Sequence, residues 1–393
     1  MGGMFYNITQ KRRLKYQETS RSAQIAKKEA LSGNGPKPIH YINIPELNPE
    51  TLMPVLPQNG FNALSLFSGG GGLDLGFERA GFKHVASYDI LEICGQTLKH
   101  NRPHWTVFSG PVDGDVRGVD WRKYKDDTDV IHGGPPCQPF SISGSQRGKN
   151  DERNMWSEFI KAINVIKPKA FVAENVPGLL SKKFKSFIKQ EIFDQLPNYY
   201  ITYFKLNSAM FGIPQKRERV IFVGFKNKKN ALSFKIPSPS YRYDHFLSKN
   251  KSKPSYYQKK LFYDNSLTKT MGVREALGLK DIGYDALSPT LRSTFTGKRN
   301  TTSILNGKSG QNYWERLQIW PNGVSENRGV ARIYLPKNGH RRLSVQDCSV
   351  IQGFPTNWEF KGAVYQILGQ IGNSVSPPMA YAIALNILKS LKS

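Results

Sequence analysis

One cysteine of this sequence sits in an unusual setting. Cys137 lies in the stretch GGPPCQPFSISG, between prolines and flanked by glycines. A buried structural cysteine more often packs as a small hydrophobic residue within a strand or a helix. A thiol in a stiff, glycine-flanked loop instead suits a nucleophile, because the thiolate is the reactive form and is favoured near positive charge. The setting therefore predicts covalent chemistry at Cys137.

Two further groups have the chemistry to work with this thiol. Glu174 stands near the end of the apolar stretch AFVAEN, and Arg217 and Arg219 stand two residues apart in QKRER. A carboxyl group in a pocket acts as a general acid if burial raises its pKa. Two arginines at this spacing share a face if the chain is extended. Alone, each feature also fits an inert thiol, a strand-end cap or a solvated face; together they indicate one reactive pocket.

A glycine-rich stretch indicates a cofactor. LFSGGGGLDLGF follows an apolar run and opens a helical pattern, the setting of a nucleotide-type ligand. Counted from Gly69, the third glycine position of G-x-G-x-x-G holds Asp74, so a dinucleotide is not supported. Asp89 and Asp115 follow later, and an acid after the second strand grips ribose hydroxyls in sheets of this kind. The stretch suits S-adenosylmethionine, an adenosine that carries a sulfonium and no phosphates. A purely structural turn and a site for a different nucleotide are the alternatives.

The elements that must position these groups alternate between strands and helices. Apolar runs predict strands at 61–67, 84–88, 129–132, 170–175 and 219–225. Amphipathic runs predict helices at 73–80, 91–100, 154–166 and 379–391. This alternation predicts an α/β fold, an open doubly wound sheet covered on both faces. Because reaction crevices lie outside the carboxyl ends of such strands, Cys137 and Glu174 are expected to face one pocket.

Local composition divides the chain into four regions. Residues 1–58 form a basic N-terminal extension with a short helix around 21–31, expected to be solvated and partly ordered and able to touch DNA. Residues 59–227 form the catalytic domain. Residues 228–340 are turn-rich, with basic residues and interleaved aromatics early in the stretch, which predicts a second, smaller, irregular domain. Residues 341–393 return to complete the first domain.

Six motifs together resemble the DNA (cytosine-5)-methyltransferases of bacterial or phage type. They are LSLFSGGGGLDLGF, DVIHGGPPCQPFSISG, FVAENVPGLL, FGIPQKRERVIFVG, RRLSVQDCSVIQGFP and QIGNSVSPPMAYAIA, and they run in the family's order from Leu64 to Ala384. The resemblance does not cover 1–58 and barely covers 226–340. It implies a Rossmann-like sheet that uses S-adenosyl-L-methionine, with the smaller domain recognising the target sequence.

The resemblance also implies a role for each motif. Cys137 attacks C6 of a flipped-out cytosine, Glu174 protonates or hydrogen-bonds N3, and Arg219 and Arg217 hold the base and the thiol. Cofactor contacts are implied for Phe67, Ser68, Gly69, Gly71, Gly72, Leu73, Asp89, Ile90, Asp115, Val116, Pro136, Trp156, Asn373, Ser374 and Val375. DNA contacts are implied for Ser141, Ser143, Gln215, Thr290, Leu291 and Arg292. Asp89 stands where the family often has Glu, and Ile90 where a large aromatic can occur, which leaves the cofactor's affinity open.

Composition bounds the partners. The chain has 393 residues, with 56 Lys and Arg against 30 acids and a net charge of +26, which predicts a polyanionic partner, most simply nucleic acid, while a role of the charge in solubility alone stays open. The family resemblance implies that this partner is double-stranded DNA. No apolar run approaches a membrane span, and the start lacks the apolar core of a secretory signal. Three scattered cysteines predict neither a disulfide framework nor a metal site. We expect a cytoplasmic, nucleoid-associated bacterial monomer, with a cognate restriction endonuclease acting on the same site.

Two rival functions were weighed. The tRNA-directed branch of the same family carries a Cys-Phe-Thr signature, which is absent because Ser349 follows Cys348. The separate RNA cytosine methyltransferases use a Thr-Cys motif, also missing. The other rival is an inactive homologue that only binds DNA. Intact Cys137, Glu174 and Arg219 oppose it, because binding alone does not require them together.

Overall fold

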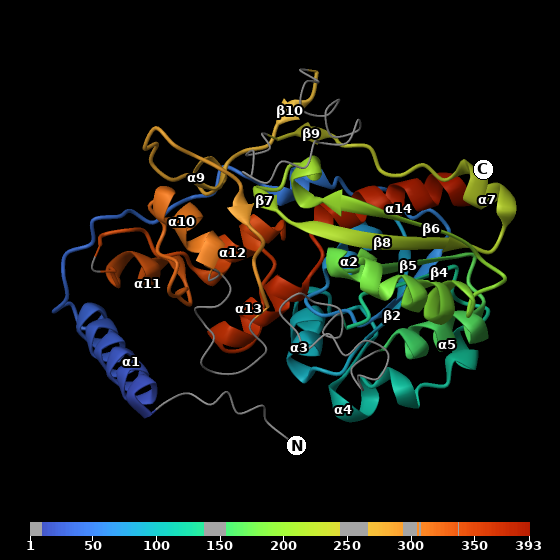
Figure 1. The fold of residues 1–393 in the computed structure, drawn as a ribbon, viewed down its shortest axis with the longest axis horizontal. Helices are drawn as coiled ribbons and strands as arrows, with labels where there is room; N and C mark the ends of the chain where they lie inside the picture. The colour runs from blue at the N-terminus through green and yellow to red at the C-terminus, as the bar shows by residue number, and fades with distance from the viewer. Residues whose placement is uncertain (1–9, 137–154, 244–265, 294–304, 306–307, 337) are drawn as a thin grey trace.

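A seven-stranded sheet forms the centre of the computed structural model, which describes residues 10–136, 155–243, 266–293, 305, 308–336 and 338–393 (Figure 1). Its order is β3-β2-β1-β4-β5-β8-β6. The strands are β1 Asn62–Leu66, β2 Lys83–Asp89, β3 Val107–Ser109, β4 Val130–Gly133, β5 Ala170–Asn175, β6 Tyr200–Asn207 and β8 Glu218–Phe225. β8 runs antiparallel to both its neighbours, β5 and β6, and the other pairs are parallel.

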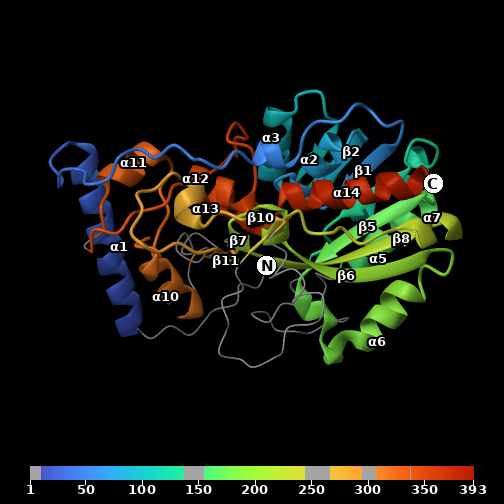
Figure 2. The same ribbon diagram turned by 90° about the horizontal axis from the view of Figure 1, so that it is seen from above.

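The sheet is buried on both faces, as its apolar strands predict. In β5, Ala170 and Val172 join one hydrophobic cluster, whereas Phe171 and Ala173 join another. Figure 2 shows helices on either side of the sheet. The first cluster includes side chains of α2 (Gly72–Arg79), α3 (Glu92–Asn101) and α14 (Pro377–Leu391); the second includes those of α5 (Trp156–Ile166) and α6 (Lys185–Phe187). The predicted doubly wound α/β fold is confirmed.

The strand order reverses between β1 and β4, which makes this the switch point where α/β sheets bind ligands. From β1 the chain moves outward to β2 and β3, and from β4 it moves the other way to β5. Leu66 at the end of β1 pairs with Gly133 at the end of β4. The glycine-rich loop and the loop that leads to Cys137 therefore leave the sheet side by side.

A smaller lobe lies at the left of Figure 1 and has its own hydrophobic cluster. Its helices are α9 Val273–Ala276, α10 Lys308–Arg316, α11 Arg328–Ile333, α12 Val345–Gln352 and α13 Val364–Asn373. Two-residue strands lie between the lobe and the sheet, namely β7 Gln215–Lys216, β9 Tyr241–Arg242, β10 Thr268–Lys269 and β11 Ser288–Pro289. The predicted irregularity holds for these strands, but α10 and α11 are helices that the sequence pattern does not reveal. Side chains of α12 and α13 join this lobe's cluster, whereas α14 packs on the sheet.

The N-terminal region differs from the predicted solvated extension. The expected helix is present as α1 (Gln10–Leu31), which begins well before the predicted start. Further along, Asn43, Leu47 and Met53 are buried. Leu47 belongs to the cluster of the smaller lobe and Met53 to a cluster of the sheet. The expectation of a solvated segment is therefore wrong for residues 43–53. The remaining helices, α4 (Gly110–Asp113) and α7 (Lys228–Ser233), are short.

Candidate active site

A carboxylate and a guanidinium meet at the edge of the sheet. Glu174 lies near the carboxyl end of β5, and Arg219 lies near the start of the adjacent strand β8. Arg219 Nε is 2.6 Å from Glu174 Oε1, and each side chain is only 10% exposed. The antiparallel register sets Glu174 opposite Ile221, which brings Arg219 within reach. The structure thus unites two of the residues that the sequence singles out.

Burial changes the proton affinity of this pair. Removal from water raises the pKa of Glu174 above its ordinary value, because the charged carboxylate loses hydration. The positive charges of Arg219 and Arg217 oppose that shift. The carboxyl group can therefore hold a proton at a higher pH than an exposed glutamate, while Arg219 fixes its position. That combination suits a general acid.

The loop toward the predicted nucleophile passes beside this pair. Asn175 Nδ2 donates a hydrogen bond to the carbonyl oxygen of Pro135 at 3.1 Å. A side chain at Gly134 would stand 3.1 Å from Glu174 Oε2. The described chain therefore contacts the end of β5 at Gly134 and Pro135. It continues to Pro136, which is partly exposed. The predicted site residues that lie outside the described residues are Cys137, Ser141 and Ser143.

The two other cysteines are poor nucleophiles. Cys94 and Cys348 are both fully buried. Burial raises the pKa of each thiol well above its ordinary value, and Asp89 and Asp347 add to the shift at Cys94 and Cys348 respectively. A thiol with a raised pKa carries little thiolate, which is the reactive form.

Arg217 takes a different position from Arg219. Its side chain is 0% exposed. Its guanidinium donates to the carbonyl oxygens of Leu291 at 3.0 Å, Gly372 at 2.8 Å and Ser374 at 2.8 Å. Arg217 therefore ties the segment around Leu291 to the end of α13. Its predicted role in holding the base stays a prediction beside this linking role.

Gln215 reinforces the same junction. Its Nε2 donates to Ile351 O at 3.1 Å and to Gln352 Oε1 at 2.9 Å, and its Oε1 accepts from the backbone N–H of Leu291 at 3.0 Å. The side chain is buried. The polar atoms of Gln215 thus face the interior in this structure, and its predicted DNA contact stays a prediction.

The three residues predicted to lie near the flipped base are placed differently from one another. Leu291 is buried, and its predicted DNA contact stays a prediction. Thr290 donates its hydroxyl to Lys216 O at 2.7 Å. Arg292 is exposed, and it keeps its candidacy as a DNA contact. A side chain at Gly372 would lie 2.3 Å from the Arg292 backbone, so the glycine permits this close approach.

The glycine-rich loop is closed on one side and open on the other. Phe67 and Gly69 have positive φ, and Gly71, also with positive φ, begins α2. A side chain at Gly72 would stand 2.1 Å from Val375 O, so the C-terminal segment packs directly against the loop. A side chain at Gly69 would meet nothing within 4 Å. The open side leaves room for a ligand to approach the backbone.

An acid and an apolar side chain border the open side. Asp89 Oδ2 accepts from the backbone N–H of Gly69 at 2.8 Å, and Oδ1 accepts from that of Leu91 at 2.8 Å. Burial raises the pKa of Asp89. The next residue, Ile90, is a large apolar side chain that is 47% exposed. The predicted contacts of Asp89 with ribose and of Ile90 with adenine stay predictions.

The other predicted cofactor residues divide into two groups. Asn373 is exposed, whereas Ser68, Leu73, Ser374 and Val375 are buried around the loop. Asp115 is engaged by Arg117, whose Nη2 lies 2.5 Å from Oδ2 and whose hydrogen bonds lower the pKa of Asp115.

Two predicted cofactor residues lie in the core. Val116 is buried in the cluster on the α5 side of the sheet. Trp156 is buried in the same cluster, with its ring edge-on to Phe222 at 5.3 Å between centroids. Both side chains thus have little exposed surface in this structure, and their predicted cofactor contacts stay predictions.

The sheet order, the glycine turn at the switch point and the carboxylate–guanidinium pair beside it are typical of a Rossmann-like methyltransferase. A family model described as C-5 cytosine-specific DNA methylase matches residues 61–389. The chain therefore belongs to the C-5 cytosine-specific DNA methylase family, and it is a DNA (cytosine-5)-methyltransferase.

Curated relatives agree with this assignment, and solved structures share the fold. The chain is 36% identical over 334 residues to Type II methyltransferase M.NgoMIV of Neisseria gonorrhoeae, covering 84% of this chain and 98% of the relative. It is 32% identical over 353 residues to M.PspPI of Psychrobacter sp. (strain TA137), covering 87% and 82%. Among solved structures, Entamoeba histolytica methyltransferase EhMeth is similar at TM-score 0.56 and 20% identity, covering 86% of this chain and 100% of that one. At such identity the likeness concerns the fold alone.

Membrane-spanning helices and metal-binding clusters are both missing from the described residues. None of the helices in these residues is both long enough and apolar enough to cross a membrane. Among the same residues, no group of His, Cys, Asp and Glu side chains is arranged to hold a metal ion.

Proposed function

We propose that this enzyme transfers a methyl group from S-adenosyl-L-methionine to C5 of a flipped-out cytosine in a specific sequence of double-stranded DNA. The reaction passes through a covalent bond between Cys137 Sγ and C6. The observation that carries the proposal is the buried Glu174–Arg219 pair beside the loop that leads to Cys137.

The pair supplies what attack on cytosine requires. C5 is a poor nucleophile until a thiolate has added to C6. As the Cys137 sulfur bonds to C6, protonated Glu174 donates its proton to N3, and the electrons of the C5–C6 bond become available at C5. Arg219 holds Glu174 and, through charge-assisted hydrogen bonds, the base. After methylation, C5 loses its proton, the C5–C6 double bond re-forms and the thiolate leaves.

The state of the other two cysteines supports Cys137 as the nucleophile. The chain has three cysteines, and the two described ones are buried with raised thiol pKa. Pro135, two residues before Cys137, also accepts a hydrogen bond from Asn175 at the end of β5. A soft nucleophile that can also leave suits both the addition and the elimination step.

The residues of the glycine-rich loop fit S-adenosyl-L-methionine. The ligand supplies an electrophilic methyl group on a sulfonium. The open side of Gly69 admits a ligand to the backbone, Asp89 stands where ribose hydroxyls need an acceptor, and the exposed Ile90 offers an apolar surface to adenine. The segment Asn373–Val375 borders the same loop from the C-terminal side.

Residues 228–340 are our candidate for sequence recognition; α9, α10 and α11 of this stretch lie in the smaller lobe, whereas α7 packs against the sheet. The excess of basic residues favours contacts with phosphates, and Arg292 is an exposed candidate for contact near the base. Extrusion of the base costs a few kcal/mol, which contacts in the pocket must offset. Because the named relatives are Type II methyltransferases, we also propose a role in a restriction-modification pair, as a monomer in the bacterial cytoplasm.

Transfer of a tritiated methyl group to mixed-sequence duplex DNA tests the proposal. We expect incorporation by the unaltered enzyme, loss with Cys137→Ser, and retention with Cys348→Ala, which removes a thiol far from the chemistry. Incorporation that survives Cys137→Ser, or label found in RNA alone, contradicts the mechanism.

A further inference from the structure

The segment that precedes the family-matched region is held at two places. The match begins at residue 61, so residues 40–59 lie outside it, and we call them the strap. In Figure 2 the strap runs in blue from the smaller lobe toward the sheet. Its first half, up to Leu47, contacts the lobe, and its second half contacts the end of α2 on the sheet.

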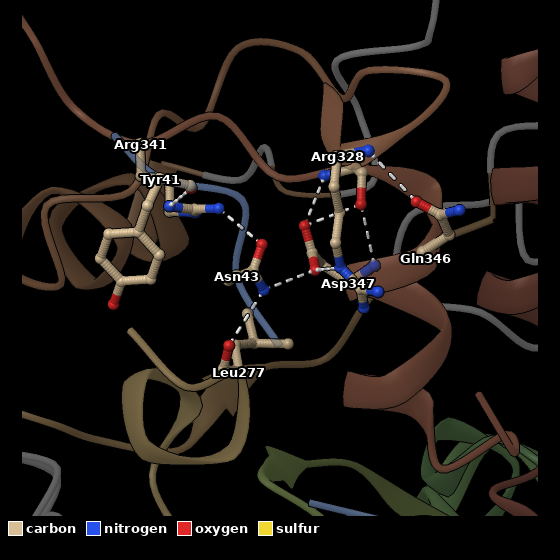
Figure 3. A network of polar contacts seen from close by, with 8 residues as sticks. Tyr41, Asn43, Leu277, Arg328, Arg341, Gln346 and Asp347 are labelled. Carbon is tan, nitrogen blue, oxygen red and sulfur yellow. Dashed lines mark hydrogen bonds and ion pairs between the residues drawn. The ribbon is translucent and has the colours of Figure 1, made fainter. Parts of the chain in front are cut away.

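Asn43 makes the densest contacts of the first half (Figure 3). The side chain is 1% exposed. Its Nδ2 donates to Leu277 O at 2.9 Å and to Asp347 Oδ1 at 3.0 Å, and its Oδ1 accepts from Arg341 Nη2 at 2.5 Å. Both polar atoms of the Asn43 side chain are thus hydrogen-bonded within the lobe. Arg328 also binds Asp347, at 2.8 Å, so the network holds both a buried acid and two arginines.

The partners of Asn43 come from different elements of the lobe. Leu277 directly follows α9, Asp347 lies in the first turn of α12, and Arg341 stands between α11 and α12. One amide side chain therefore fixes α9 relative to α12. The chain that leaves α9 continues to β11 and to Arg292, the exposed candidate for DNA contact.

Backbone contacts extend this grip. Leu47 donates its N–H to Ala276 O at 3.1 Å, and the Tyr41 hydroxyl donates to Gly278 O at 2.9 Å. Gly278 has φ +61, and a side chain there would stand 2.0 Å from Ile44 O. Glycine is required at this point, because only it allows the strap to lie so close.

The second half of the strap is anchored to the sheet. Glu50 forms an ion pair with Arg79 at the end of α2. Leu56 donates its N–H to Arg79 O at 2.9 Å. Met53 is fully buried in a cluster of the sheet. The strap thus bridges the two parts of the molecule.

We infer that the strap sets the position of the recognition lobe on the catalytic sheet, and that Asn43 is a positioning residue for DNA binding. The inference rests on the proposed function. Asn43 acts through α9 and α12, away from the glycine-rich loop. Its loss is expected to weaken DNA binding without changing cofactor binding.

Asn43→Ala tests this, with Ile44→Ser as the matched control because the Ile44 side chain is 80% exposed. We expect Asn43→Ala to raise the dissociation constant for duplex DNA, and the KM for DNA, about tenfold, because buried partners lose their hydrogen bonds. Affinity for S-adenosyl-L-methionine and kcat at saturating DNA should stay within about twofold, and Ile44→Ser should match the unaltered enzyme. If Asn43→Ala does not fold, Leu47→Ala, which trims the side chain that the strap contributes to the hydrophobic cluster of the lobe, serves with the same measurements.

Two results overturn the inference: a folded variant with unchanged DNA affinity, or one in which DNA and cofactor affinity fall together, as general destabilisation predicts. Failure of the proposed function is distinguishable, since it appears as absent methyl transfer by the unaltered enzyme. DNA affinity of the variant relative to the unaltered chain still decides the inference in that case. An unaltered chain that binds no DNA overturns both.

Discussion

Glu174 experiences two opposing influences on its proton. Burial raises the pKa of its carboxyl group, and the guanidinium of Arg219, 2.6 Å away, acts in the opposite direction. The first makes the acid able to donate to a ring nitrogen, and the second keeps its geometry fixed. A base bound in this pocket would exclude more water and strengthen the electrostatic interactions within it.

The pH dependence of methyl transfer follows from this balance. Because the protonated carboxyl is the active form, kcat/KM should fall as pH rises through the pKa of Glu174. Arg219→Met removes an opposing positive charge, so it should raise that pKa and move the falling limb to higher pH, at a lower overall rate. Arg219→Lys keeps the charge and should leave the limb near its original position. Single-turnover rates between about pH 5 and pH 9 measure this.

Glu174→Gln provides the control for that profile. It should abolish the limb and lower the rate by roughly 10²- to 10⁴-fold, the usual contribution of a general acid. A limb that stays in place in both Arg219→Met and Glu174→Gln assigns the ionisation to another group.

At the scale of elements, the junction of β7, the segment after β11 and the end of α13 unites the two parts of the site. Arg217 hydrogen-bonds to Leu291 and to Ser374. Gln215 hydrogen-bonds to Leu291 and to Gln352. Gln352 Nε2 also donates to Ser374 O at 2.6 Å. The segment implied for DNA and the segment implied for the cofactor therefore share the same buried side chains.

Arg217→Met should loosen both segments. We expect a loss of about 3 kcal/mol in the free energy of unfolding, since several charge-assisted hydrogen bonds disappear and buried carbonyls lose donors. Affinities for DNA and for S-adenosyl-L-methionine should weaken together. Lys216→Met, at the exposed neighbouring position, should change the unfolding free energy by no more than about 0.5 kcal/mol. Denaturant unfolding and two binding titrations decide, and normal affinities in Arg217→Met refute the linking role.

The sequence predicts those elements whose burial follows a regular pattern. The strands around Ala63, Val130 and Val172 are apolar because both faces are covered, so their runs stand out. β6 does not, because several of its side chains are exposed at the edge of the sheet. In the lobe, α10 contributes Trp314 to the core, but polar residues surround it and hide the pattern.

Site residues were predictable where chemistry alone selects them. Glu174 and Arg219 come together as expected, since neighbouring strands of one sheet carry them. The burial of Arg217 was not predictable from the sequence. Strand alternation places Arg217 on one face with Arg219, but Arg217 lies between β7 and β8, outside both strands. Asn43 could not be found either: its partners lie more than two hundred residues away in the sequence.

At the scale of the whole molecule, the site lies where the sheet meets the smaller lobe. The sheet carries Glu174, Arg219 and the glycine-rich loop, and the lobe carries Arg292. The strap and the Arg217 junction hold the two together at separate places. Under the proposed mechanism, a flipped cytosine meets the acid and the methyl donor at the sheet while the lobe contacts the surrounding DNA.

The central claim is that Cys137 bonds to C6 of a cytosine in DNA. Bisulfite sequencing of DNA from a host that expresses the chain locates the target, and a duplex with 5-fluorocytosine at that position then tests the claim. Fluorine cannot leave C5 as a proton does, so elimination is blocked after methyl transfer. We predict a denaturation-resistant complex that needs S-adenosyl-L-methionine, with mass spectrometry placing the modified base on Cys137. No complex under conditions where the unmodified duplex is methylated, or a complex through another residue, would contradict the account.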